Sequence, residues 1–177
     1  MCGLRATGLT LAVALLAACS SGGHDGSTSV FQHLSIADNG DVIAYARDGG
    51  NARIGAMGEL AIAGKAVPVA PAQRELLQAY HADAVKLQKD GIATGAAGLS
   101  TGMHALGAVA TGLASGKPDS IDAKVNAKAD KVEALARVVC EDLARLYADQ
   151  GKLAAAVPAF APYATIESHN VSECHAD

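Results

Sequence analysis

Residues 30–69 consist of short apolar runs separated by turn signals. Asn-Gly and Gly-X pairs, which accept positive φ and favour hairpin turns, divide the segment into VFQHLSIA, DVIAYAR, ARIGAM, LAIA and AVPV. The pattern predicts an antiparallel β-meander of four or five strands. A sheet of this size needs a cover over its apolar face, so we expect a helix to cross it.

A helical pattern begins at Pro71, which suits the first turn of a helix. No further proline occurs before Pro118, and apolar side chains recur every three or four positions at Leu76, Leu77, Tyr80, Ala84 and Leu87. The pattern predicts one long Gly/Ala-rich helix over residues 71–115.

A second helix is predicted over residues 119–151. Its apolar positions are again spaced by threes and fours, at Ile121, Val125, Val132, Leu135, Val139, Leu143 and Leu146, and Gly151 is expected to end it. The two helices should form an antiparallel hairpin, and Pro158 and Pro162 should break any long helix in the tail, residues 152–177. The predicted fold is a single α+β domain over residues 30–177, with the β-meander first and the hairpin after it.

Residues 91–116, GIATGAAGLSTGMHALGAVATGLASG, carry seven glycines and no formal charge. On a helical wheel Gly91, Gly95, Gly98 and Gly102 lie on the side of Leu76 and Leu87, and seven glycines cost about 7 kcal/mol relative to alanine. We therefore expect these four glycines to form a groove in which the second helix packs closely. Two alternatives remain: a membrane-spanning segment, for which strongly apolar residues are few, and a glycine surface for self-association.

The N-terminus predicts a signal peptide over residues 1–18 and a flexible tether over residues 19–29. Arg5 precedes an apolar run, Leu9 to Ala18, that is too short to cross ~30 Å of hydrocarbon. Leu16-Ala17-Ala18-Cys19 resembles the lipobox of bacterial lipoproteins. The resemblance implies that Cys19 is diacylated and becomes the first residue of the mature chain. Ser20 after it resembles the pattern of lipoproteins that reach the outer membrane facing the periplasm, whereas an ordinary cleaved signal is the alternative.

Four cysteines occur in the sequence. If Cys2 leaves with the signal and Cys19 carries lipid, then Cys140 and Cys174 remain as a pair in an oxidising compartment. A disulfide between them is predicted, with two free thiols as the alternative. It would pin the C-terminal tail to the second helix.

Charge and composition argue against several classes of function. The chain has 14 basic and 18 acidic residues and no basic run interleaved with aromatics, so we do not expect nucleic-acid binding. His169, Cys174, His175 and Asp177 are metal-ligand types whose spacing matches no tight zinc pattern. Neither a nucleophile with a sequence-placed base nor a phosphate loop is found, so no cofactor, metal or catalytic site is expected.

The segment GELAIAGKAVPVAPAQRELL, residues 58–77, resembles the YggN-like group of uncharacterised proteobacterial envelope proteins. Members share a strand, a Gly-Lys turn, a strand and a Gln-Arg helix start leading into a small-residue region. The resemblance implies an architecture and an envelope location. The leading hypothesis is a non-enzymatic envelope lipoprotein, held to the membrane by its lipid, with a structural or interaction role that includes an envelope partner or self-association. The alternative is a periplasmic module that binds a small apolar ligand or lipid.

Overall fold

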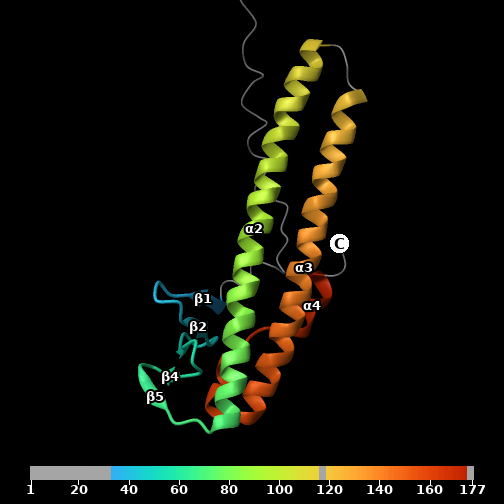
Figure 1. The fold of residues 1–177 in the computed structure, drawn as a ribbon. Coiled ribbons are helices and arrows are strands. Elements are labelled where there is room, and N and C mark those ends of the chain that lie inside the picture. The colour runs from blue at the N-terminus through green and yellow to red at the C-terminus, as the bar shows by residue number, and fades with distance from the viewer. Residues whose placement is uncertain (1–32, 116–118, 175–177) are drawn as a thin grey trace, which may run out of the picture.

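The computed structural model describes residues 33–115 and 119–174, with the side chains at 105, 106, 108–115 and 119–125 left out (Figure 1). An antiparallel sheet is followed by two long helices, a short 3₁₀ helix and a short terminal α-helix. The predicted α+β fold class is therefore confirmed. Figure 1 shows that the sheet lies beside the start of the first long helix, while the helical hairpin extends well beyond the sheet.

The sheet is a five-stranded meander in which neighbours in sequence are neighbours in space. Its strands are β1 (Leu34–Ile36), β2 (Val42–Tyr45), β3 (Asn51–Ile54), β4 (Leu60–Ile62) and β5 (Lys65–Val67). Glycines with positive φ occupy the predicted turns at positions 40, 49, 58 and 64. Apolar residues align across the strands on one face in two rows: Leu34, Ala44, Ala52 and Ile62, and Ile36, Val42, Ile54 and Leu60. This face supplies much of the core.

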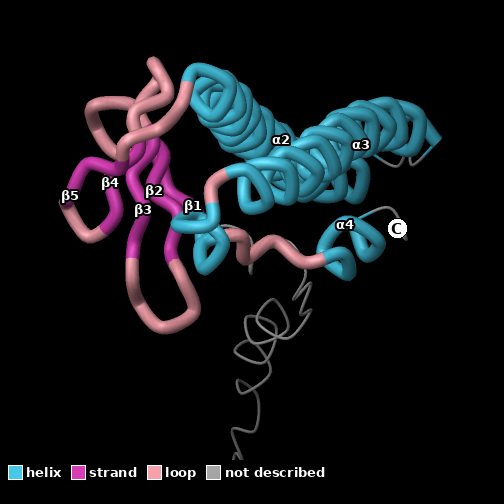
Figure 2. The backbone as a smooth tube through the Cα atoms, turned by 90° about the horizontal axis from the view of Figure 1, so that it is seen from below, coloured by secondary structure: helices cyan, strands magenta, loops and turns pink. Residues whose placement is uncertain are grey.

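The turn between β3 and β4 contacts the beginning of the first long helix. A Cβ at Gly58 would lie 2.5 Å from the carbonyl oxygen of Arg74, so only glycine fits there. Gln78 Nε2 donates to the carbonyl of Met57 at 3.1 Å. The meander is thus fixed against the first turns of the hairpin, as Figure 2 shows from below.

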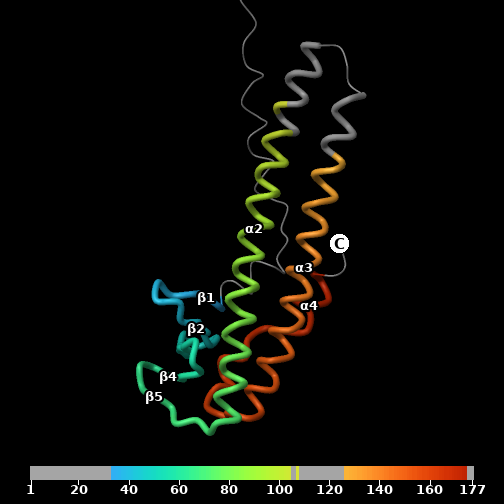
Figure 3. The backbone as a smooth tube through the Cα atoms, viewed as in Figure 1, coloured from blue at the N-terminus to red at the C-terminus, as the bar shows by residue number. Residues whose placement is uncertain are grey.

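The hairpin consists of α2 (Pro71–Ser115) and α3 (Asp119–Ala156), which run antiparallel (Figure 3). Helix α2 has the predicted bounds, whereas α3 continues five residues past Gly151. The prediction that Gly151 ends the helix is wrong, because the next turn carries Leu153, which is fully buried in the core. Burial of a leucine outweighs the cost of about 1 kcal/mol for one glycine in a helix.

Gln73 joins the open end of the hairpin. Its side-chain oxygen accepts from the backbone N–H of Ala70 at 2.8 Å, so it supplies half of a capping box at the start of α2. Its side-chain nitrogen donates to the carbonyl of Ala156 at the end of α3 at 2.6 Å. One glutamine therefore satisfies a free N–H of one helix and a free C=O of the other.

The C-terminal segment completes the core. It contains the 3₁₀ helix η1 (Pro158–Tyr163) and α4 (Ser168–Cys174). Phe160 is fully buried and meets Tyr80 of α2 edge to face, with ring centroids 5.4 Å apart. Gln150 holds the link between η1 and α4, because its oxygen accepts from the N–H of Ile166 at 3.2 Å and its nitrogen donates to the same residue's carbonyl. The prolines break the helix as predicted, and the segment is packed rather than loose.

Candidate functional site

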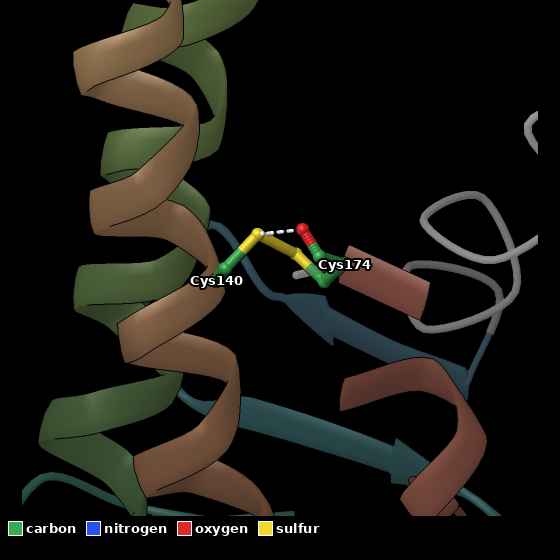
Figure 4. The surroundings of a disulfide bond; sticks show 2 residues. All are labelled: Cys140 and Cys174. Carbon is green, nitrogen blue, oxygen red and sulfur yellow. Dashed lines mark hydrogen bonds between the residues drawn. A yellow bond between two sulfur atoms is a disulfide. The ribbon is translucent and has the colours of Figure 1, made fainter. Parts of the chain in front are cut away.

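The predicted disulfide is present. Cys140 of α3 and Cys174 of α4 are joined, with their Cα atoms 5.5 Å apart and 34 positions between them in sequence (Figure 4). Cys140 is buried. The bond holds α4 against α3 and closes a loop long enough to contribute about 3 to 4 kcal/mol through the unfolded state. Its role in the fold is structural.

The predicted lipidation site, Cys19, lies outside the described residues. Within residues 33–115 and 119–174, no helix is both long enough and apolar enough to cross a membrane. Among the same residues, no group of three or more side chains of metal-ligand type is placed to hold a metal ion.

Among the described side chains of α2, the large apolar ones that reach the core lie in its first half, residues 71–90. Leu77, Tyr80, Ala84 and Leu87 are at most 1 % exposed. Continuing along the same side, the partly buried positions are Gly91, Thr94, Ala97, Gly98 and Thr101. The two threonine hydroxyls are satisfied within the helix, donating to the carbonyls of Asp90 at 2.7 Å and of Ala97 at 2.9 Å. From Gly91 to Thr101, the side of α2 that faces α3 therefore carries small and hydroxyl residues.

The predicted close-packed glycine groove is wrong at Gly95, Gly98 and Gly102. A Cβ built at any of these three positions meets no atom within 4 Å. Gly95 and Gly102 are exposed, whereas Gly98 and Gly91 lie partly buried. The helical wheel gives the angular position of each residue but not the separation of the two helix axes. Here the backbones do not approach closely enough at Gly98 for a methyl group to touch α3.

The large apolar side chains described in the far half of α2, between Gly91 and His104, point outward. Ile92, Leu99 and Met103 are 67 %, 72 % and 67 % exposed, and Ala96 is exposed between them. We call these four residues the outer stripe. They recur at intervals of four, three and four residues, so they lie on one side of the helix. The spacing of these four residues is visible in the sequence. Only the structure identifies which side of α2 is left uncovered by α3.

A group of charged residues joins α2 to α3 near the point where the two halves of α2 meet. The carboxylate of Asp142 is 1 % exposed and accepts from Lys86 Nζ at 2.8 and 2.7 Å, and it also pairs with Arg145. Lys86 contacts Asp90 as well, at 2.7 Å. Because the buried carboxylate has two cationic partners, this group of charged residues links the two helices and is not a reactive site.

One turn nearer the sheet, Asp83 faces Asp149 of α3. Burial raises the pKa of Asp83 above its ordinary value, and a hydrogen bond with Asp149 and the negative charge of that residue raise it further, while Arg145 and Lys86 oppose the shift. Lys152 Nζ lies 2.7 Å from Asp149. Asp83 therefore keeps its proton to a higher pH than a solvated aspartate does.

A cavity of about 200 Å³ lies between the sheet and the C-terminal segment. Its lining is mostly polar: His33, Arg47, Thr165, Ile166, Glu167, His169 and Asn170. Many of these groups already have partners, because Glu167 pairs with Arg47 and lies 3.0 Å from His169 Nδ1, while Asn170 accepts from the N–H of Glu167 at 2.9 Å.

Comparison of the chain with protein-family models, with curated proteins and with solved structures finds no match to any of them.

Proposed function

We propose that the protein is a non-enzymatic envelope lipoprotein that acts through protein contacts made by the far half of its helical hairpin. The observation that carries the proposal is the outer stripe. Three large apolar side chains in a row, each about two-thirds exposed, expose an unusual amount of apolar surface for one helix face. Contiguous exposed apolar surface of this kind marks contact sites in soluble domains, whereas single exposed apolar residues are ordinary.

The position of the stripe supports the same role. The sheet and the C-terminal segment pack around the first half of α2, whereas the far half extends beyond the sheet (Figure 1). A lipid on Cys19 would lie 14 residues before His33, a length that reaches at most about 50 Å. The domain would thus remain close to the membrane while the hairpin stays free to meet a partner. The resemblance of residues 58–77 to the YggN-like group is consistent with this location.

The alternative of a module for a small apolar ligand has less support. The cavity beside β1 and α4 has a volume of about 200 Å³, which is below the roughly 300 to 1,000 Å³ typical of ligand pockets.

The anchor is tested by metabolic labelling with a palmitate analogue. The full-length chain should be labelled, and the Cys19→Ser variant should not be. A wild-type chain that stays unlabelled would disprove the lipid anchor and leave the contact role to be judged separately.

The contact role is tested by site-specific photo-crosslinking in intact cells. A photo-reactive amino acid at Leu99 should form adducts with protein, and the same amino acid at Arg137, which is exposed on α3, should not. If Leu99 yields only lipid adducts or no adduct at all, the proposed function is wrong.

A further inference from the structure

The outer stripe has the residue spacing of a coiled-coil seam. Ile92, Ala96, Leu99 and Met103 alternate steps of four, three and four, which is the a/d pattern of a heptad repeat with isoleucine or leucine at d. In the sequence, Leu106, Ala110 and Leu113 continue the alternation to the end of α2. The opposite seam of the same helix already faces α3. Helix α2 therefore carries a second seam with no partner among the described residues.

The residues beside the seam are small. Gly95 and Gly102 border it on one side and Ala93 and Ser100 on the other, and all four are exposed. At the two glycines even a Cβ would meet only open space. A ridge of large side chains between rows of small ones allows another helix to come close and to receive the ridge in the spaces between its own side chains.

The absence of charge along the stripe bears on which partner fits. Flanking charges normally select the partner of a coiled coil, and a foreign helix would be matched through them. Residues 91–116 carry no formal charge, so no charge on the seam discriminates against an identical copy. A helix that lies on a lipid surface typically carries Lys or Arg around its apolar face, and this segment has neither. These features favour an identical helix over a foreign helix or a lipid surface.

We infer that the outer stripe is the seam of a homodimer in which a second copy of this chain lays its own outer stripe against it. The inference rests on the proposed function and specifies its partner. A two-fold contact pairs a surface with itself, so the large d residues of one copy meet the spaces beside Ala96 of the other. Residues 91–115 give a helix about 36 Å long, and an interface about 12 Å wide would bury roughly 900 Å² in total, near the lower limit for a specific complex. The dimer is therefore weak when dilute and is favoured when both copies are held on one membrane.

The test uses two full-length copies with different tags, expressed together at native level in their own envelope. One copy carries a photo-reactive amino acid at Leu99 or at Met103. We expect an adduct of twice the chain mass that contains both tags, at least fivefold more abundant than the adduct from the same amino acid at Arg137.

A matched pair of substitutions in the second copy tests the seam itself. Ala96→Arg should reduce the two-tag adduct at least fivefold, because it places a charge between the large residues. Met57→Arg, at an exposed apolar residue in the β3–β4 turn, should leave the adduct unchanged. Both positions are exposed, so the circular dichroism melting curve should confirm that each variant folds.

The outcomes separate this inference from the proposed function. Adducts that carry one tag and another protein would overturn the homodimer and leave the contact role intact. Adducts with lipid alone, or no adduct from either position, would overturn both. A two-tag adduct that persists in the Ala96→Arg variant would overturn the seam.

Discussion

Helix α2 is one continuous helix, but the large side chains up to Leu87 point into the core, whereas those described from Ile92 to Met103 point outward. From Pro71 to Asp90, Leu77, Tyr80 and Leu87 point into the core and are almost completely buried. From Gly91 to Met103 the core side holds glycine and threonine, whereas isoleucine, leucine and methionine point outward. The first half derives its stability from tertiary packing. Between Gly91 and His104 the second half has no buried large side chain, and its large residues are exposed.

A single helix can therefore pack into a core along one part of its length and carry exposed apolar side chains along another. The sheet, η1 and the Lys86–Asp142 contact all lie along the first half, where α2 is held from several sides. In the far half the neighbour is α3, whose facing residues Val132, Leu135 and Val139 remain partly exposed. Four predictions follow from the difference between the halves.

The largest effect is expected from truncating a leucine in each half. Leu87→Ala removes a side chain that is 1 % exposed and should lower the free energy of unfolding by about 3 kcal/mol, through lost burial and the cavity that remains. Leu99→Ala removes one that is 72 % exposed and should cost less than about 0.5 kcal/mol in dilute protein. Urea unfolding followed by circular dichroism measures both. Equal losses would show that the two halves are not different in packing.

A smaller loss of stability is expected from a substitution at Lys86, near the point where the two halves of α2 meet. Lys86→Met removes one of the two cations beside the buried carboxylate of Asp142. Because the Lys86 side chain is about half exposed, solvent already weakens the pair, and we expect a loss of about 1 to 2 kcal/mol in urea unfolding. Lys89→Met, at an exposed position one turn further along α2, is the control and should change stability little. If Lys89→Met lowers the free energy of unfolding as much as Lys86→Met does, the contact with Asp142 does not stabilise the packing of the two helices.

In the far half, filling the glycine positions should increase stability. At Gly95 and Gly98 a Cβ meets no neighbouring atom, so Gly95→Ala and Gly98→Ala should each raise the free energy of unfolding by about 0.5 to 1 kcal/mol through helix propensity. Gly58→Ala is the control with the opposite expected sign. It should lower the free energy of unfolding, because its Cβ would collide with the backbone of Arg74 and its φ is positive. A loss of stability at Gly98 would indicate a close-packed groove after all.

The smallest effect is expected from pH in the first half. The pKa of Asp83 is raised in the folded protein, so between its ordinary value of 3.8 and the raised value the folded state binds more protons than the unfolded state. Stability due to this group is therefore present at low pH and is lost as pH rises through that window. Asp83→Asn should be more stable than the wild type at pH 7, and the gain should shrink below pH 4. Urea unfolding of both proteins across this pH range measures the difference, and a gain that does not change with pH would contradict the prediction.

Much of the fold could be predicted from local pattern. Turn glycines divide the strands and Pro71 marks the start of α2, because both depend on short-range chemistry. The disulfide was predicted from the cysteine count together with the expectation that the chain is exported. The end of α3 could not be predicted from Gly151, because the core position of Leu153 outweighed a local signal. The burial of Phe160 and Ile166 was also missed, because prolines indicate where a helix stops but not where the following chain packs.

The candidate contact site, too, could be predicted from the sequence only in part. The spacing of Ile92, Ala96, Leu99 and Met103 is written in the sequence, and so is the lack of charge around them. Which side of α2 faces α3 is decided by the anchoring of its first half against the sheet and η1.

The sequence by itself thus determined the order of elements, the length of α2 and the pairing of Cys140 with Cys174, because propensity, turn chemistry and cysteine count act through near neighbours in the chain or through compartment. Only the tertiary structure decided that the glycines do not form a tight groove and that the outer stripe is open. Helix separation and exposure depend on the packing of residues far apart in sequence, and periodicity alone carries no information about the distance to the next helix.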